Sequence, residues 1–165
     1  CGPASALLAA ELSMPSADGG VLSAFVGKKE DVVRSGRALA VVHGREVVVI
    51  HHAGAFYAMD RLCYHAGGPL YLGDIEDVEG RQCIVCPWHK YRITLAEGEG
   101  LYQAVDPRDP QRRASWGSKG PKQRTHAVHE ESGDLFVTLS DLSLRRESDY
   151  YQSEEYQQVM RNAKK

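Results

Sequence analysis

The sequence predicts an all-β fold, and three observations support this prediction. Short runs with strand-like composition recur from residue 21 onward, glycine-containing turn pairs separate them, and similar runs return near the end of the chain at 125–128 and 135–139. The chain has 165 residues, 42% of them hydrophobic, which is enough to bury one core. We therefore expect antiparallel hairpins built around a single domain.

The strands follow in order along the chain. We expect them at 22–26, 38–43, 46–51, 55–59, 81–86, 92–96, 125–128 and 135–139. The segment 28–35 is charged, with only Val32 and Val33 as an apolar pair. One helical turn is an alternative there, but the composition favours a solvated connector.

The two ends of the chain differ from this pattern. Residues 1–20 mix small residues and proline without a basic region, which predicts a disordered leader. Residues 141–165 form a polar, tyrosine-bearing tail in which 154–160 can form a short helix. We expect no catalytic role for this tail.

Composition limits the partners and the compartment. The net charge of −2 and a pI near 6.4 give no overall attraction to nucleic acid, and no apolar run is long enough to span a membrane. Four cysteines are too few for a disulfide scaffold once two are assigned to a metal. A reducing compartment follows, which predicts a cytoplasmic protein, with an organelle as the alternative.

Two short motifs carry the chemistry. Cys63-x-His65 and Cys86-x-x-His89 each place one thiolate and one imidazole on a tight loop, so two facing loops supply four metal ligands. Gly68 and its neighbours make the first loop sharp. A structural zinc site is the alternative, but zinc modules usually pair cysteine with cysteine and histidine with histidine.

These motifs resemble the Rieske family, over a stretch from about residue 21 to 139. Within that family, residues 83–91 and 98–103 are similar to the small soluble vertebrate-type members. The resemblance implies one [2Fe-2S] cluster per chain, with Cys63 and Cys86 on the buried ferric iron and His65 and His89 on the outer iron that becomes ferrous.

The resemblance also implies a domain plan. It predicts a Rieske-type antiparallel β-sandwich over 21–140, in which 21–60 and 125–140 form the base and 61–97 form a small cluster-binding subdomain. Residues 98–123, rich in glycine and proline, would be an insertion. Gly120 and Pro121 fall where family members have a third, shielding loop.

Departures from the family pattern indicate a low potential. Rieske subunits of cytochrome bc-type complexes have a disulfide across the cluster, and Gly68 and Trp88 stand at the comparable positions. Tyr91 and Ile93 stand where those subunits place hydroxyl donors to the cluster. We therefore expect no such bridge and fewer donors.

The resemblance implies electron transfer without a substrate-transforming site. Rieske oxygenases add a catalytic domain with a mononuclear iron, for which this chain has no convincing ligand triad. The chain is thus more similar to Rieske-type ferredoxins, which implies a monomeric one-electron carrier with a reductase and an acceptor as redox partners. A redox or iron–sulfur sensor and an electron-transfer component of an oxygenase system remain the alternatives.

The remaining chemically active residues have simpler expected roles. Cys83 is expected to be a buried strand thiol. A basic run at 107–124 is usually a solvated loop, with a docking surface as the alternative. The other histidines are expected in solvent or in the core: His43, His51, His52, His126 and His129.

Overall fold

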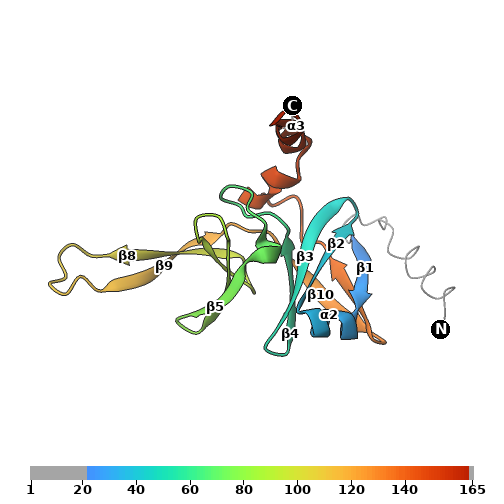
Figure 1. Ribbon diagram of the computed structural model, residues 1–165, viewed down its shortest axis with the longest axis horizontal. Coiled ribbons are helices and arrows are strands. Elements are labelled where there is room, and N and C mark those ends of the chain that lie inside the picture. Colours follow the sequence, from blue (N-terminus) through green and yellow to red (C-terminus); the bar gives the residue numbers. More distant parts are fainter. Residues whose placement is uncertain (1–21, 164–165) are drawn as a thin grey trace. The chain divides into compact units, whose positions relative to one another are not determined.

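The computed structural model describes residues 22–163 and forms two compact units, each built on one antiparallel sheet (Figure 1). The first unit comprises Cys1–Asp60 and Thr125–Arg145, and the second comprises Arg61–Arg124 and Arg146–Lys165, as far as these are described. The leader expected at 1–20 lies outside the described residues. The all-β prediction is confirmed.

The first unit contains a six-stranded sheet in the order β1-β11-β10-β4-β3-β2. The strands are β1 (Ser23–Lys28), β2 (Arg37–Val42), β3 (Arg45–His52), β4 (Ala55–Asp60), β10 (Thr125–Glu131) and β11 (Asp134–Thr138). The strands at the two ends of this order, β1 and β2, also contact each other, so the sheet curls around its core. Each strand lies within about three residues of its expected position, because short apolar and β-branched runs are bounded by turn residues.

A short helix, α2 (Lys29–Ser35), connects β1 and β2. The solvated connector favoured at 28–35 is therefore wrong, and the helical alternative is right. Val32 is buried in the core of the first unit, and the Gly36 N–H donates to the Val32 carbonyl at 2.7 Å with a φ of 85°. Glycine adopts this left-handed conformation without steric cost and so ends the helix.

A buried polar group stabilises the first unit. Arg45 makes two hydrogen bonds to the Asp60 carboxylate, at 2.6 and 2.8 Å, and His126 Nε2 lies 2.9 Å from Asp60 Oδ1. The Ser140 N–H donates to His126 Nδ1 at 3.1 Å, so the ring proton is on Nε2 and is donated to Asp60. His126 is therefore a core residue, as the sequence predicts.

The second unit contains a five-stranded sheet in the order β5-β6-β7-β8-β9. The strands are β5 (Asp74–Val78), β6 (Arg81–Val85), β7 (Arg92–Thr94), β8 (Glu99–Val105) and β9 (Ala114–Pro121). Cys83 is buried with Val78 and Leu101, and Trp116 packs against this cluster. The prediction of a buried strand thiol is confirmed.

The stretch 98–123, which the sequence analysis treats as an insertion without strands, forms the long β8–β9 hairpin (Figure 1). Strand β8 continues the sheet by pairing with β7. The prediction failed because Gly117 interrupts the alternation of β9. A Cβ at that position would lie 2.6 Å from the Tyr102 ring, so glycine leaves room for that ring to cross the hairpin.

The C-terminal part consists of a 3₁₀ helix, η2 (Glu147–Gln152), and helix α3 (Glu154–Ala163). The helix expected at 154–160 is confirmed. Arg124 and Asp149 form a bidentate ion pair at 2.7 and 2.9 Å, which connects this part to the end of the hairpin. No helix of the described residues is long and apolar enough to cross a membrane.

Candidate metal centre

The first ligand loop, residues 63–68, follows strand β4 and carries Cys63 and His65. The Cys63 N–H donates to the Gly68 carbonyl and the Gly67 N–H donates to the Cys63 carbonyl, each at 2.8 Å. Gly67 has a φ of 79°, a conformation that a residue with a side chain rarely adopts. These contacts make the loop a closed turn with Cys63 buried and His65 exposed.

The second ligand loop, residues 86–91, follows strand β6 and returns into β7. The Cys86 N–H donates to the Tyr91 carbonyl at 2.8 Å and closes the loop. His89 and Lys90 have φ values of 66° and 59°, both in the left-handed region. Such a backbone costs roughly 1–3 kcal/mol per residue and persists where surrounding contacts require it.

The structure brings the two predicted cysteine ligands together in the interior. Cys63 and Cys86 are buried, and the hydrogen bond between their side chains raises the pKa of Cys63 and lowers the pKa of Cys86 to about 7. The pair therefore holds a proton on Cys63 more tightly than on Cys86. Loss of both protons on metal binding would leave two adjacent thiolates.

The two predicted histidine ligands also lie together, but at the exposed end of the loops. The rings of His65 and His89 have centroids 5.1 Å apart and are nearly perpendicular. Desolvation, and then the charges of His89 and Lys119, lower the pKa of His65. The neutral imidazole is the form that binds metals.

The donor set fits a binuclear cluster. Among the described residues, no three His, Cys, Asp or Glu side chains converge as ligands for one metal ion. The four predicted ligands form a buried thiol pair and an exposed imidazole pair, a division compatible with the ligand set of a Rieske cluster. A Cβ on Gly68 would lie 2.5 Å from Cys86 Sγ, so glycine leaves the space beside that sulfur open.

The residues that surround His65 have no signal in the sequence. The Tyr91 ring stacks on the imidazole, with centroids 3.8 Å apart, and Lys119 Nζ lies 4.7 Å from the centroid of Tyr91. Gly120 and Pro121, where a third loop is expected, end strand β9, and Lys119 of the same strand lies over Tyr91 of the second ligand loop.

Most of the basic run is neutralised. Four of its six cations form ion pairs: Arg108 with Asp106, Arg113 with Asp109, Lys122 with Glu147, and Arg124 with Asp149. Lys119 and Arg112 are exposed cations of the run for which the described residues show no carboxylate partner. Lys119 is thus the cation of this run that contacts the predicted site.

Gln123 is a further residue that the sequence did not indicate. Its Oε1 accepts a hydrogen bond from the Tyr64 N–H, and its Nε2 donates to the Leu62 carbonyl, both at 2.8 Å. The buried amide thus binds the main chain on both sides of Cys63, as a neighbouring strand would.

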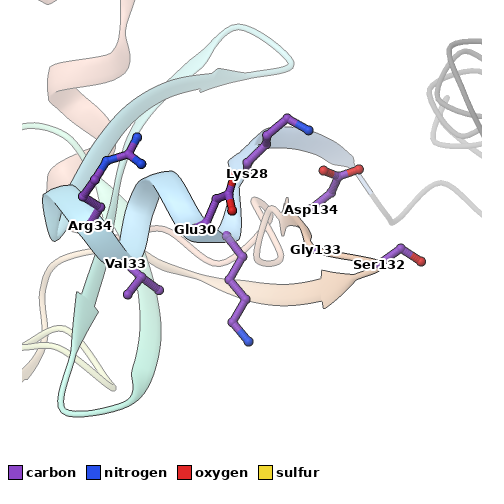
Figure 2. Close-up of a pocket in the computed structure, with 8 residues that line it drawn as sticks. Lys28, Glu30, Val33, Arg34, Ser132, Gly133 and Asp134 are labelled. Carbon is purple, nitrogen blue, oxygen red and sulfur yellow. The ribbon is translucent and has the colours of Figure 1, made fainter.

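A surface pocket in the first unit contains none of the predicted ligands. Figure 2 shows its side chains, which carry charges of both signs. It is lined by Lys28, Lys29, Glu30, Val33, Arg34, Ser132, Gly133 and Asp134. These residues form no metal-binding group, and we assign no function to this pocket.

Comparisons with known proteins identify the family. Residues 24–142 match the family described as soluble Rieske-type ferredoxin. A human Rieske domain-containing protein is 53% identical over 137 residues, which cover 83% of this chain and 87% of the human protein. The 3-phenylpropionate/cinnamic acid dioxygenase ferredoxin subunit of Escherichia coli K12 is 27% identical over 110 residues, which cover 66% of this chain and 87% of the subunit.

Two solved structures share the fold. The ferredoxin of carbazole 1,9a-dioxygenase from Nocardioides aromaticivorans IC177 matches with a TM-score of 0.52 and 21% identity, over 70% of this chain and 96% of that chain. A putative NADH-dependent nitrite reductase small subunit from Mycobacterium tuberculosis matches with a TM-score of 0.53 and 13% identity, over 72% of this chain and 95% of that chain. With its two ligand loops and its antiparallel sheets, this chain belongs to the family of soluble Rieske-type ferredoxins, a membership that implies an iron–sulfur electron carrier.

Proposed function

We propose that this protein is a one-electron carrier that uses one [2Fe-2S] cluster of the Rieske type. The observation that supports this function best is the separation of the ligands, with Cys63 and Cys86 buried and His65 and His89 exposed. A cluster held in this way has one enclosed iron and one iron that is reached through imidazole edges.

In this proposal Cys63 and Cys86 hold the inner iron, and His65 and His89 hold the outer iron. The bound cluster supplies reversible one-electron chemistry. The protein excludes water from the thiolates, and desolvation lowers the pKa of the His65 imidazole. No side chain acts as an acid, base or nucleophile, so no substrate-transforming site is proposed.

We propose that the exposed histidine edges are where electrons enter and leave. The indole of Trp88, 47% exposed in the second ligand loop, gives a partner an apolar contact beside them. The partners would be a reductase and an acceptor protein, and the carrier would act as a monomer in the cytoplasm. An organelle is the alternative compartment.

One alternative function has a specific observation in its favour. The E. coli relative is named as the ferredoxin subunit of a dioxygenase, so this chain is a candidate for the electron-transfer component of an oxygenase system. Such a component requires a catalytic partner in a separate chain. Co-purification with, and reduction of, a mononuclear iron protein would favour this alternative over a general carrier.

The cofactor is tested on the purified protein. We expect a reddish-brown protein with two irons and two sulfides per chain and, after dithionite reduction, the electron paramagnetic resonance (EPR) spectrum of a Rieske centre. A colourless protein with stoichiometric zinc would contradict the proposal and support the zinc alternative.

The ligand set is tested at His89. We expect His89→Ala to lose the cluster because a coordination position opens. His89→Cys can retain it at a lower potential because a thiolate adds negative charge. His129→Ala is the control, because His129 lies on β10 of the first unit and stacks on Phe136. Full iron and sulfide content in His89→Ala would exclude His89 as a ligand.

A further inference from the structure

The C-terminal residues 146–156 pack on the second unit, although they lie beyond the part of the chain that matches the family, which ends at residue 142. Their base is firmly attached. The Asp149 carboxylate binds the Arg124 guanidinium through two hydrogen bonds, and Ser148, fully buried, accepts one from the Arg124 N–H at 2.9 Å. We call residues 146–156 the strap.

The far end of the strap contacts the first ligand loop. The Tyr151 hydroxyl donates to the main-chain carbonyl of His65 at 3.2 Å. A Cβ on Gly67 would lie 2.9 Å from the Tyr151 ring and 3.0 Å from the Tyr156 hydroxyl. The strap therefore covers the turn between Cys63 and Gly68 so closely that glycine is required there.

The strap holds its tyrosines in a fixed arrangement. The rings of Tyr150, Tyr151 and Tyr156 meet edge to face, with centroids 4.8 to 5.6 Å apart. Edge-to-face contact is a favoured geometry for aromatic rings and orients the Tyr151 hydroxyl.

The contact is placed where it affects a ligand. The first ligand loop is a short turn whose other described main-chain hydrogen bonds hold Cys63, Gly67 and the residues around them. The hydrogen bond from Tyr151 is made to the main-chain carbonyl of His65, the residue whose imidazole is the predicted ligand. Helix α3 begins at Glu154, within the strap; it buries no residue, and it contributes the Tyr156 hydroxyl to the contact with Gly67.

We propose that the strap positions the first ligand loop and that Tyr151 is the positioning residue for His65. By holding the carbonyl of His65, it sets the direction of the imidazole toward the outer iron, and by covering Gly67 it keeps water from the thiol side of the turn. The effect on the cluster rests on the proposed function, whereas the effect on the loop does not.

The variant Tyr151→Phe tests the loop directly, because it keeps the ring and removes only the hydroxyl. We expect faster amide hydrogen exchange in residues 63–68, by about fivefold, the factor that corresponds to a hydrogen bond worth about 1 kcal/mol. Exchange in residues 86–91 should not change. Tyr150→Phe is the control, because no hydrogen bond joins its hydroxyl to the ligand loop and its ring is half-exposed. Equal exchange in wild type and Tyr151→Phe, or equal acceleration by Tyr150→Phe, would overturn the proposal.

The loaded protein provides the second measurement. We expect Tyr151→Phe to shift the midpoint potential and the EPR g-values of the cluster and to lose iron to a chelator faster, while the midpoint of thermal unfolding changes little. If Tyr151→Phe changes the exchange rate but the protein shows no Rieske EPR spectrum, the strap proposal stands and the proposed cofactor is wrong. A loaded Tyr151→Phe protein with unchanged potential, spectrum and iron loss would overturn the positioning role.

Discussion

The ring of Tyr91 lies almost parallel to the imidazole of His65, with centroids 3.8 Å apart and planes 11° apart. On Tyr91, Lys119 Nζ lies 4.7 Å from the ring centroid. The Lys119 ammonium thus lies over the Tyr91 ring, and the Tyr91 ring lies over the imidazole of a predicted metal ligand. This arrangement covers one face of the imidazole and places a positive charge close to the proposed outer iron.

The charge of Lys119 should raise the midpoint potential, because it favours the reduced cluster. Removing it in Lys119→Met should lower the potential by about 20–90 mV, the effect of a unit charge roughly 8 Å away in a medium of dielectric constant 80 to 20. Protein-film voltammetry at low salt measures this. Arg112→Met is the matched control, because it removes the same charge seven residues away, toward the turn of the β8–β9 hairpin. An equal shift in both variants would show that only net charge matters.

Gly68 should be required for cluster binding. A methyl group there would lie 2.5 Å from Cys86 Sγ and 3.2 Å from the Trp88 side chain. We expect Gly68→Ala to retain a folded β structure by circular dichroism but to bind substoichiometric iron. Adding Trp88→Gly removes the contacts with the Trp88 side chain and not the contact with the sulfur, so it should not restore iron binding. Restoration by the double variant would mean that the indole, rather than the sulfur, needs the space.

The midpoint potential should lie in the lower part of the Rieske range, which spans roughly −150 to +300 mV. Ile93 is buried and has no hydroxyl, and the Tyr91 ring stacks on His65, so we expect fewer hydroxyl donors to a cluster sulfur than in the cytochrome bc-type subunits. Each missing charge-assisted bond lowers the potential by tens of mV, on the order of 100 mV for two. We also expect the midpoint to be flat near neutral pH and to fall only in alkali. Voltammetry from pH 6 to 10 checks both; a high midpoint that already declines at pH 7 would contradict them.

The base of the hairpin should be sensitive to acid through Glu99. A hydrogen bond with Glu97, another from Ser118 and the ion pair with Arg81 lower the pKa of Glu99 to about 2. Because this pKa is below its ordinary value of 4.5, the stabilisation is complete above pH 4.5 and is lost as the pH falls toward 2. The pKa of Glu97 is raised, so its effect on stability has the opposite dependence on pH. This carboxylate is exposed and contributes less to stability than Glu99 does.

This acid sensitivity can be followed by the fluorescence of Trp116, which packs on the second core cluster, in a Trp88→Phe background. Between pH 4.5 and 2, the Trp116 fluorescence should change more steeply in the protein that retains Glu99 than in the Glu99→Gln variant. Identical titrations would show that the ion pair with Arg81 does not stabilise the hairpin. Asp134→Asn, in the first unit, serves as the control for loss of a carboxylate.

The sequence predicted those parts of the molecule that depend on local pattern. The strands of the first unit follow from short apolar and β-branched runs between turn residues, and the pairing of Cys63 with Cys86 and of His65 with His89 follows from their placement on hairpin loops. Strands β8 and β9 were missed because Gly117 and the prolines near the turn hide their alternation. The roles of Lys119 and Tyr151 had no local signal, because their partners lie 28 and 86 residues away.

The bonds of Gln123 impose an order on the assembly of the centre. Its amide holds the main chain at Leu62 and Tyr64, which precede it by 61 and 59 residues. A chain that is still emerging from the ribosome therefore presents Cys63 and His65 on an unfinished turn until the β8–β9 hairpin has been made. Iron and sulfide would meet a completed site only late in synthesis, so delivery of the cofactor becomes a step after translation of the hairpin rather than one that accompanies the first ligand loop.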